Sequence, residues 1–168
     1  MHKAKLVKRS LQTVGCLLFI FFLIRSLSPQ EIDDVTPGIP CEEALLNKVD
    51  VLWIVPFFND ESIATNKTWC AEILSLNKTL GLHGIHHTYN EFDTLRNESY
   101  LQPGIKAFQD CFNQTPALFK APRLALSSEN AAWLKKSYGI SGPLGQSLHK
   151  VYHCNDTGRV PNKLMRWI

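Results

Sequence analysis

Apolar and polar residues alternate along this chain with two different periods. The run VDVLWIVPFF, from Val49 to Phe58, is β-branched and aromatic on both faces, which is typical of a buried strand in a parallel sheet. LGLHGI, residues 80–85, is a second short apolar strand that ends among histidines. Between these runs, residues 67–80 carry the stripe of an amphipathic helix, formed by Trp69, Ile73, Leu76 and Leu80.

The same alternation continues further along the chain. IKAFQDCF places Ile105, Phe108 and Phe112 on one helical face, and PALFKAP is typical of a strand followed by a turn. SSENAAWLKKSYG predicts a helix with Ser127 as its N-cap and Gly139 just beyond its end. Alternating strands and helices predict an α/β fold with a parallel sheet, either layered or closed as a barrel.

Other segments give weaker patterns. CEEALLNK is a short helix candidate, whereas SLSPQEIDDVTPGIP and NEFDTLRNESYLQPG are rich in polar residues and turn formers, so we expect loops there. Residues 142–168 show no clear period. In parallel α/β folds the chemistry gathers in loops at the carboxyl ends of strands, and both IDDVTPG and HGIHH stand where such loops are expected.

The N-terminal region has the features of a targeting segment. Basic residues in 1–10 precede an apolar run of 11 residues, Val14 to Ile24, which is shorter than the roughly 20 that span a bilayer comfortably. We expect 1–10 to be a cytoplasmic basic tail and 11–28 to be an uncleaved signal-anchor or a cleaved signal peptide. Residues 29–168 then form a lumenal or extracellular domain of a single-pass type II membrane protein, or of a secreted protein.

Glycosylation sequons and cysteines agree with export. Roughly one N-x-[ST] sequon is expected by chance, whereas the chain has five, at Asn66, Asn77, Asn97, Asn113 and Asn155. One cysteine, Cys16, lies in the hydrophobic segment. The remaining four predict two disulfides with three possible connectivities, or else buried free thiols: Cys41, Cys70, Cys111 and Cys154.

The formal net charge of +3 comes from the N-terminal segment. Residues 1–28 hold five basic and no acidic residues, which leaves 13 basic and 15 acidic residues, a charge of −2, in residues 29–168. This composition gives no indication of nucleic-acid binding.

Candidate chemistry begins with GLHGIHHTY, residues 81–89. His83 and His87 could converge on one divalent cation, since neutral imidazole is a good ligand for zinc and similar metals. The alternative is a polar surface loop. His86 lies between the two and is expected to be an exposed loop residue.

The adjacent carboxylates Asp33 and Asp34 strengthen the metal hypothesis. Burying two like charges together is unfavourable, and a metal removes that cost by binding one of them while the other acts as a base. Asp34, His83 and His87 would form a three-ligand set with open positions for water and substrate. The alternative is an ordinary Asp-Asp turn before Thr-Pro-Gly.

The segments IDDVTPG, WIVPFF, GLHGIHHTY and FKAPRLALS, in this order, resemble the polysaccharide deacetylase superfamily (NodB-like, carbohydrate esterase 4), closest to its divergent, uncharacterised deacetylase-like branch. The resemblance covers about residues 31–140. It implies a deformed or incomplete (β/α) barrel, shortened or truncated relative to the family, and a divalent metal, expected to be Zn²⁺. It also implies Asp33 as general base and Asp34, His83 and His87 as metal ligands.

Two family positions differ in this chain. Where the family has an arginine that orients the base, the chain offers Lys120 and, three residues later, Arg123. The family's late general-acid histidine has no clear counterpart, because His149 and His153 lack its sequence context.

Three functional readings follow. The first is a metal-dependent hydrolase that removes N-acyl groups from an N-acetylated glycan. The second is a catalytically inactive lumenal protein of the same fold that binds a glycan or a protein partner. The third is a membrane-tethered structural domain without a site, in which Asp34 would lie far from the histidines.

Overall fold

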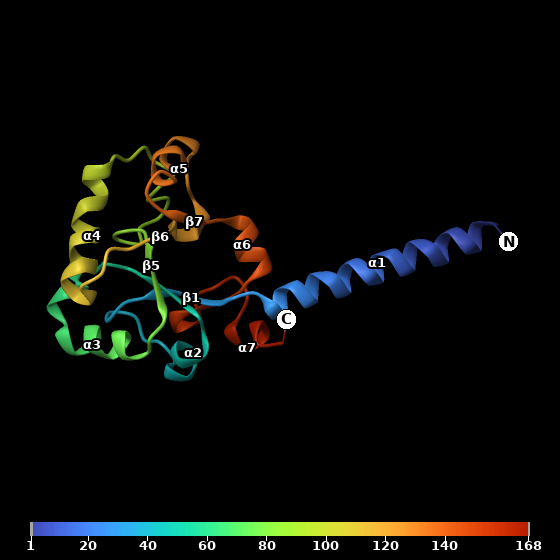
Figure 1. Cartoon of the computed structure of the whole chain (residues 1–168), viewed down its shortest axis with the longest axis horizontal. Coiled ribbons are helices and arrows are strands. Elements are labelled where there is room, and N and C mark those ends of the chain that lie inside the picture. The colour runs from blue at the N-terminus through green and yellow to red at the C-terminus, as the bar shows by residue number, and fades with distance from the viewer. Residues whose placement is uncertain (1, 168) are drawn as a thin grey trace.

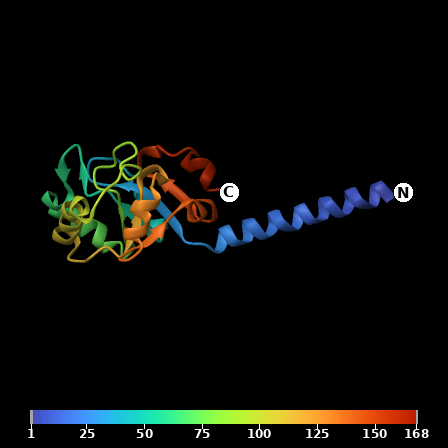
Figure 2. The same cartoon turned by 90° about the horizontal axis from the view of Figure 1, so that it is seen from above.

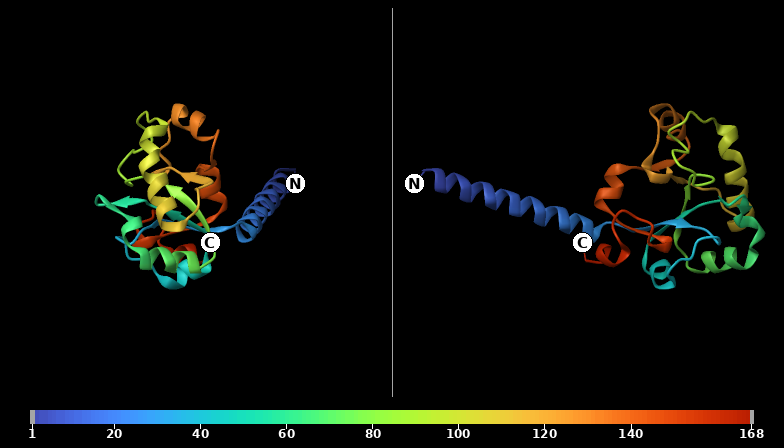
Figure 3. Two further views of the ribbon diagram at one scale, coloured as in Figure 1. Left: turned by 60° about the vertical axis from the view of Figure 1, so that its left-hand side comes forward. Right: turned by 180° about the vertical axis from the view of Figure 1, so that it is seen from behind.

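The computed structural model describes residues 2–167, with side chains from Gln12 onward. One long helix, α1 (His2–Leu27), projects from an α/β domain that begins at Gln30 (Figure 1). The C-terminal helix α7 (Asn162–Met165) lies near the point where α1 meets the domain, as the view from behind also shows (Figure 3).

The domain is built on a curled parallel sheet of six strands, which forms half of a barrel. The spatial order is β7-β6-β5-β2-β1-β8, and every neighbouring pair is parallel. The parallel α/β prediction is therefore confirmed, with an open sheet rather than a closed barrel. The strands are β1 (Gln30–Val35), β2 (Val51–Ile54), β5 (Thr79–His83), β6 (Leu118–Lys120), β7 (Gly139–Ser141) and β8 (Lys150–His153).

Helices connect successive strands, as right-handed parallel crossovers require. They are α2 (Glu43–Lys48), α3 (Lys67–Ser75), α4 (Glu98–Phe112), α5 (Ser128–Leu134) and α6 (Pro143–Leu148). A small antiparallel hairpin and three 3₁₀ turns complete the fold: β3 (Phe57–Phe58), β4 (Glu61–Ser62), η1 (Ile63–Thr65), η2 (Pro122–Leu124) and η3 (Cys154–Asp156).

The two faces of the half-barrel differ in chemistry because side chains alternate along each strand. Ile32, Leu82 and Phe119 belong to the apolar core, which also contains buried side chains of α3 and α4. The intervening residues of the same strands make the opposite face polar, and they include Glu31, Asp33, His83 and Lys120.

Several expectations for loops and strands were wrong. SLSPQEIDDVTPGIP contains strand β1, between β2 and β8. The predicted strand Val49–Phe58 is split, because β2 ends at Ile54 and Phe57 begins the hairpin. Residues 142–168 form α6, β8 and α7, each only four to six residues long, and elements this short show no readable period.

NEFDTLRNESYLQPG was expected to be a loop, but α4 begins inside it at Glu98. The sequon residue Asn97 caps this helix, and its Oδ1 accepts a hydrogen bond from the Tyr100 N–H at 3.1 Å. Pro103 lies inside the helix. The loss of helix stability that a proline causes is offset by burial of a strongly apolar face. Leu101 and Phe108 on this face are each 1% exposed. Ser127 caps α5 as predicted, by accepting from the Asn130 N–H.

Helix α1 leaves much apolar surface in contact with solvent. Side chains such as Phe19 and Leu17 are 69% and 61% exposed. Among the described residues, no helix has both the length and the apolarity needed to cross a membrane. The side chains of the predicted basic tail, residues 1–10, lie outside the described part of the chain.

Two disulfides select one of the three connectivities. Cys41–Cys154 joins the segment after β1 to the segment after β8, and Cys70–Cys111 joins α3 to α4. Cys16 is exposed and forms no disulfide. All five sequon asparagines are exposed, as glycosylation would require, and their modification stays a prediction.

Replacing Cys41 and Cys154 together by alanine is expected to lower the free energy of unfolding by about 2–5 kcal/mol, because the bridge closes a loop of 113 residues in the unfolded chain. Urea denaturation followed by circular dichroism measures the change. Cys16→Ala is the matched control and should leave the denaturation midpoint unchanged. An unaltered midpoint in the double variant would contradict the pairing.

Candidate metal centre

A break in strand β1 directs two adjacent carboxylates toward one site. In a regular strand Asp33 and Asp34 would point to opposite faces. Here Asp34 adopts a left-handed backbone conformation with φ 66°, and the β1–β2 register shifts between Ile32 and Val35. This bulge-like irregularity leaves both carboxylates 4% exposed at the carboxyl end of the strand.

The predicted ligand set comes together at this edge of the sheet. Nε2 of His87 lies 2.7 Å from Oδ1 of Asp34, and Nε2 of His83 lies 3.4 Å from the same oxygen. Three ligand atoms, one from each residue, lie within 4.8 Å of one another. Ligands at the roughly 2.0–2.2 Å bond lengths of zinc are separated by distances of this order. The reading without a site, which required these residues to be far apart, does not match the structure.

His83 is held in the tautomer that a metal needs. It is 2% exposed, and its Nδ1 lies 3.0 Å from the Lys120 carbonyl oxygen. A carbonyl can only accept, so Nδ1 carries a proton, and Nε2, on the side of Asp34, is the ring atom that could bind a metal. A backbone carbonyl behind a ligating histidine commonly has this role in metal sites.

The loop that carries His87 is organised by a buried carboxylate that sequence reasoning missed. Glu91 is 1% exposed, and its oxygens accept hydrogen bonds from the N–H groups of Ile85, His86 and His87 at 3.0–3.2 Å. Gly84 has φ 63°, and a Cβ there would lie 2.4 Å from Oε2 of Glu91. The glycine therefore permits the tight approach of Glu91. The position of Glu91 just after the histidines is the sequence feature that could have indicated its role.

Lys120, rather than Arg123, contacts the predicted base. Nζ of Lys120 lies 2.8 Å from Oδ1 of Asp33 and 3.3 Å from Oε2 of Glu31. Lys120 is 1% exposed, so this ion pair is little screened by water. The Arg123 guanidinium instead stacks over the ring of Tyr89, 4.3 Å from its centroid.

Glu31 completes the support of Lys120, a role that was not predicted from the sequence. It is 2% exposed, accepts a hydrogen bond from Trp53 Nε1 at 2.7 Å and contacts His149 Nδ1. Glu31 thus fixes Lys120 beside Asp33.

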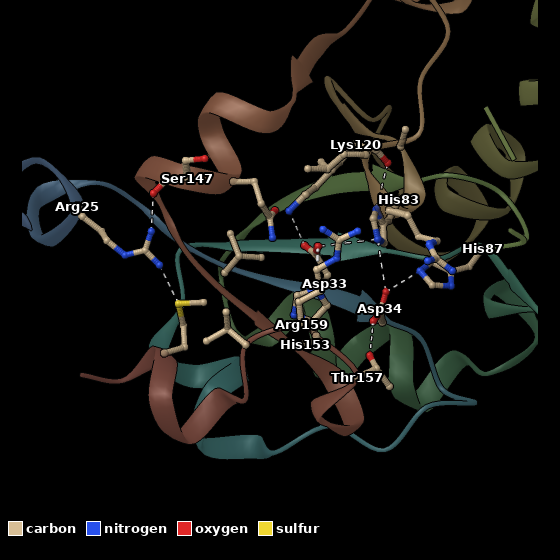
Figure 4. A pocket seen from close by; sticks show the side chains of 18 of the residues that line it. Arg25, Asp33, Asp34, His83, His87, Lys120, Ser147, His153, Thr157 and Arg159 are labelled. Atoms are coloured by element: carbon tan, nitrogen blue, oxygen red, sulfur yellow. Dashed lines mark hydrogen bonds and ion pairs between the residues drawn. The ribbon is translucent and has the colours of Figure 1, made fainter. Parts of the chain in front are cut away.

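The structure also supplies a late histidine beside the predicted base. Strand β8 pairs with β1 so that His153 is the register partner of Asp33, and its Nε2 lies 3.6 Å from Oδ2 of Asp33. Nδ1 of His153 is buried without a hydrogen-bond partner within the described part of the chain. The sequence did not assign this role because β8 was not recognised. Thr157 Oγ1 donates to Oδ2 of Asp34 at 2.9 Å from the following turn (Figure 4).

Charges in the cluster shift two pKa values. Burial alone would raise the pKa of Asp34, but hydrogen bonds and charge interactions with His83 and His87 hold it well below its usual range. Burial would lower the pKa of His87, but the Asp34 carboxylate outweighs this and raises it. Without metal, a proton on His87 therefore stabilises the pair, and a metal ion would take its place.

The cluster lies in the wall of a cavity of about 840 Å³. Asp33, Asp34, His83, His87 and Lys120 all line it, together with residues of α1, α6 and the C-terminal segment. A largely buried three-ligand group with a neighbouring carboxylate and open space can bind a divalent ion and a small polar group beside it.

A comparison of the chain with models of known protein families finds no match, and a comparison with curated protein sequences finds none either. The resemblance to polysaccharide deacetylases therefore stays a prediction based on the ordered motifs.

The chain of residues 1–168 is expected to bind about one zinc ion, and Asp34→Ala or His87→Ala should weaken binding at least about 100-fold by removing a ligand. Metal analysis after equilibrium dialysis measures the stoichiometry. His86→Gln is the control, because the His86 ring packs on Phe57 and lies outside the ligand group. Full zinc retention by both ligand variants would exclude this site.

Zinc affinity is expected to rise as pH increases toward the raised pKa of His87 and then level off. Below that pKa the metal competes with a proton for His87. Each unit by which the pH falls therefore lowers the apparent zinc affinity about tenfold. Titration calorimetry over roughly pH 5 to 8, the range in which histidine ordinarily titrates, gives the profile. An affinity that is constant with pH would show that His87 is not a ligand.

Proposed function

We propose that this protein is a metal-dependent hydrolase of the polysaccharide-deacetylase type, which removes N-acyl groups from a carbohydrate. One observation carries the proposal: the Asp34–His83–His87 group, in which only His87 is partly exposed, lies next to a second carboxylate, Asp33, that Lys120 holds at 2.8 Å. The half-barrel sheet is compatible with the incomplete barrel that the resemblance implies.

The donor set suits zinc, since two imidazoles and one carboxylate are ligands that it commonly takes in catalytic sites. A bound divalent ion would supply Lewis acidity to the acyl carbonyl oxygen and to water. The surrounding side chains are then assigned roles by their contacts.

In this proposal Asp33 accepts a proton from the attacking water. Its partner Lys120 orients the carboxylate, because the buried Lys120 Nζ lies 2.8 Å from Oδ1 of Asp33. His153, 3.6 Å from Asp33, donates a proton to the departing amine. The chain therefore offers both proton-transfer groups, although only the base was expected from the sequence.

We also propose that the domain works in the secretory pathway or outside the cell, attached to a membrane through residues 11–28 or secreted. Two disulfides and five exposed sequon asparagines support an oxidising, glycosylating compartment. The expected partner is an N-acetylated glycan.

Asp33→Asn is expected to lower kcat/KM for acetate release from N-acetylglucosamine oligomers by at least about 1,000-fold, and His153→Ala by about 100- to 10,000-fold. Both variants should keep their zinc, since neither side chain belongs to the ligand group. Acetate is measured by a coupled assay, with His86→Gln as the control.

Loss of zinc together with activity would mean that these residues act on the metal site rather than on proton transfer. Zinc binding without acetate release by the unaltered protein would favour the second reading, a glycan-binding protein of the same fold.

A further inference from the structure

The cavity has two chemically different ends. One end holds Asp34, His83 and His87, and the other is lined by Phe21, Phe22 and Arg25 of α1. Figure 4 shows Arg25 and His87 on opposite sides of the cavity, with Asp33 and Lys120 between them. Helix α1 is therefore part of the wall of the candidate site, rather than a separate appendage.

Helix α1 continues the apolar end of the cavity as an exposed apolar surface. Phe21 and Phe22 are 37% and 47% exposed, and apolar residues nearer the N-terminus, such as Leu17 and Phe19, are more exposed. The helix extends away from the domain, as the view from above shows (Figure 2). Exposed apolar area on this scale is unfavourable in water and marks a surface that binds lipid or another apolar partner.

Arg25 fixes the C-terminal end of α1 against the domain. This residue is 7% exposed, donates from Nη1 to the carbonyl oxygen of Ser147 in α6 and from Nη2 to Sδ of Met165 in α7 at 2.9 Å. Because α6 and α7 flank strand β8, this anchor holds Phe21 and Phe22 at the edge of the cavity.

Two further cations, Arg123 and Arg159, line the cavity. In Figure 4 Arg159 lies between Arg25 and His87, in the part of the cavity that Asp33 and His153 also line. Guanidinium groups suit the planar, multidentate recognition of phosphate. A ligand that matches the cavity therefore combines a hydrolysable acyl group, an anionic linkage and an apolar tail.

We propose that the substrate of this site is a lipid-linked glycan carried in a membrane, with its sugar joined to the lipid through phosphate. The acyl group lies at the Asp34–His83–His87 end and the phosphate near Arg159. The lipid passes Phe21 and Phe22 and continues along α1 into the bilayer. The acyl chemistry rests on the proposed function, whereas lipid recognition is tested separately.

Two features favour lipid over a second copy of the chain as the ligand of the apolar surface of α1: the charge of the N-terminal segment, and the continuity of this surface with the cavity. Before its apolar run the N-terminal segment has basic but no acidic residues: Lys3, Lys5, Lys8 and Arg9. Such a segment is attracted to anionic membrane surfaces, whereas two copies would repel each other there.

The test measures binding of the full chain to phosphatidylcholine vesicles with and without N-acetylglucosaminyl-diphospho-polyprenol, by vesicle flotation. We expect the glycolipid to strengthen binding at least about tenfold, as contacts between charged groups and phosphate imply. The double variant Phe21→Asn, Phe22→Asn should lose this gain. Its matched control is Leu17→Asn, Phe19→Asn, which removes similar apolar area from the same helix outside the cavity.

The Leu17→Asn, Phe19→Asn control should bind plain vesicles as weakly as the Phe21→Asn, Phe22→Asn variant does. It should keep the increase in binding that the glycolipid causes. Arg159→Gln should reduce the gain about tenfold. Its control, Arg166→Gln, changes an arginine that pairs with exposed Glu42 and should have no effect. A gain that is absent in the unaltered protein, or equal in both double variants, would overturn the proposal.

Acetate release in the same vesicles separates this inference from the proposed function. A glycolipid-dependent gain without acetate release would leave lipid-linked glycan binding supported and the hydrolase proposal refuted. Faster release from soluble oligomers than from the glycolipid would overturn the substrate class. Dimerisation through α1 in sedimentation experiments, without any gain from glycolipid, would assign this surface to a second copy.

Discussion

Three carboxylates on one buried strand impose the main constraint on this protein. Glu31, Asp33 and Asp34 of β1 are 2–4% exposed, and β1 lies between β2 and the edge strand β8. Buried negative charge is stable only when it is paired and hydrogen-bonded. The partners come from strands on both sides: Lys120 from β6, and His83 and His153 from β5 and β8.

This requirement links charge pairing to the curled shape of the sheet. Lys120 reaches from β6 to Glu31 and Asp33 across the intervening strands β5 and β2. A curled sheet brings such distant strands within side-chain reach on its concave face, while the opposite face keeps its apolar contacts with helices. The disulfide Cys41–Cys154 ties together the segments that follow β1 and β8, next to the same site.

The carboxylates of Asp33 and Asp34 make the site chemically useful because their surroundings differ. Asp34 shares a proton or a metal ion with two histidines, whereas Asp33 has Lys120 on one side and His153 on the other. Two adjacent carboxylates in such different surroundings can divide the work of binding and proton transfer. The same cavity extends to α1, so the chemistry and the apolar helix share one space.

The sequence alone determined the α/β class and the candidate ligand group Asp34, His83 and His87, because periodicity is local and carboxyl ends of parallel strands share one edge. The first turns of helix α4, residues 98–104, were missed, since tertiary burial of its apolar face outweighs Pro103 and the polar residues around it. Only the tertiary structure decided the disulfide pairing, Lys120 over Arg123 as the partner of Asp33, and the place of His153. These depend on helix packing, strand order and register, which join residues 41 or more positions apart and which no local pattern encodes.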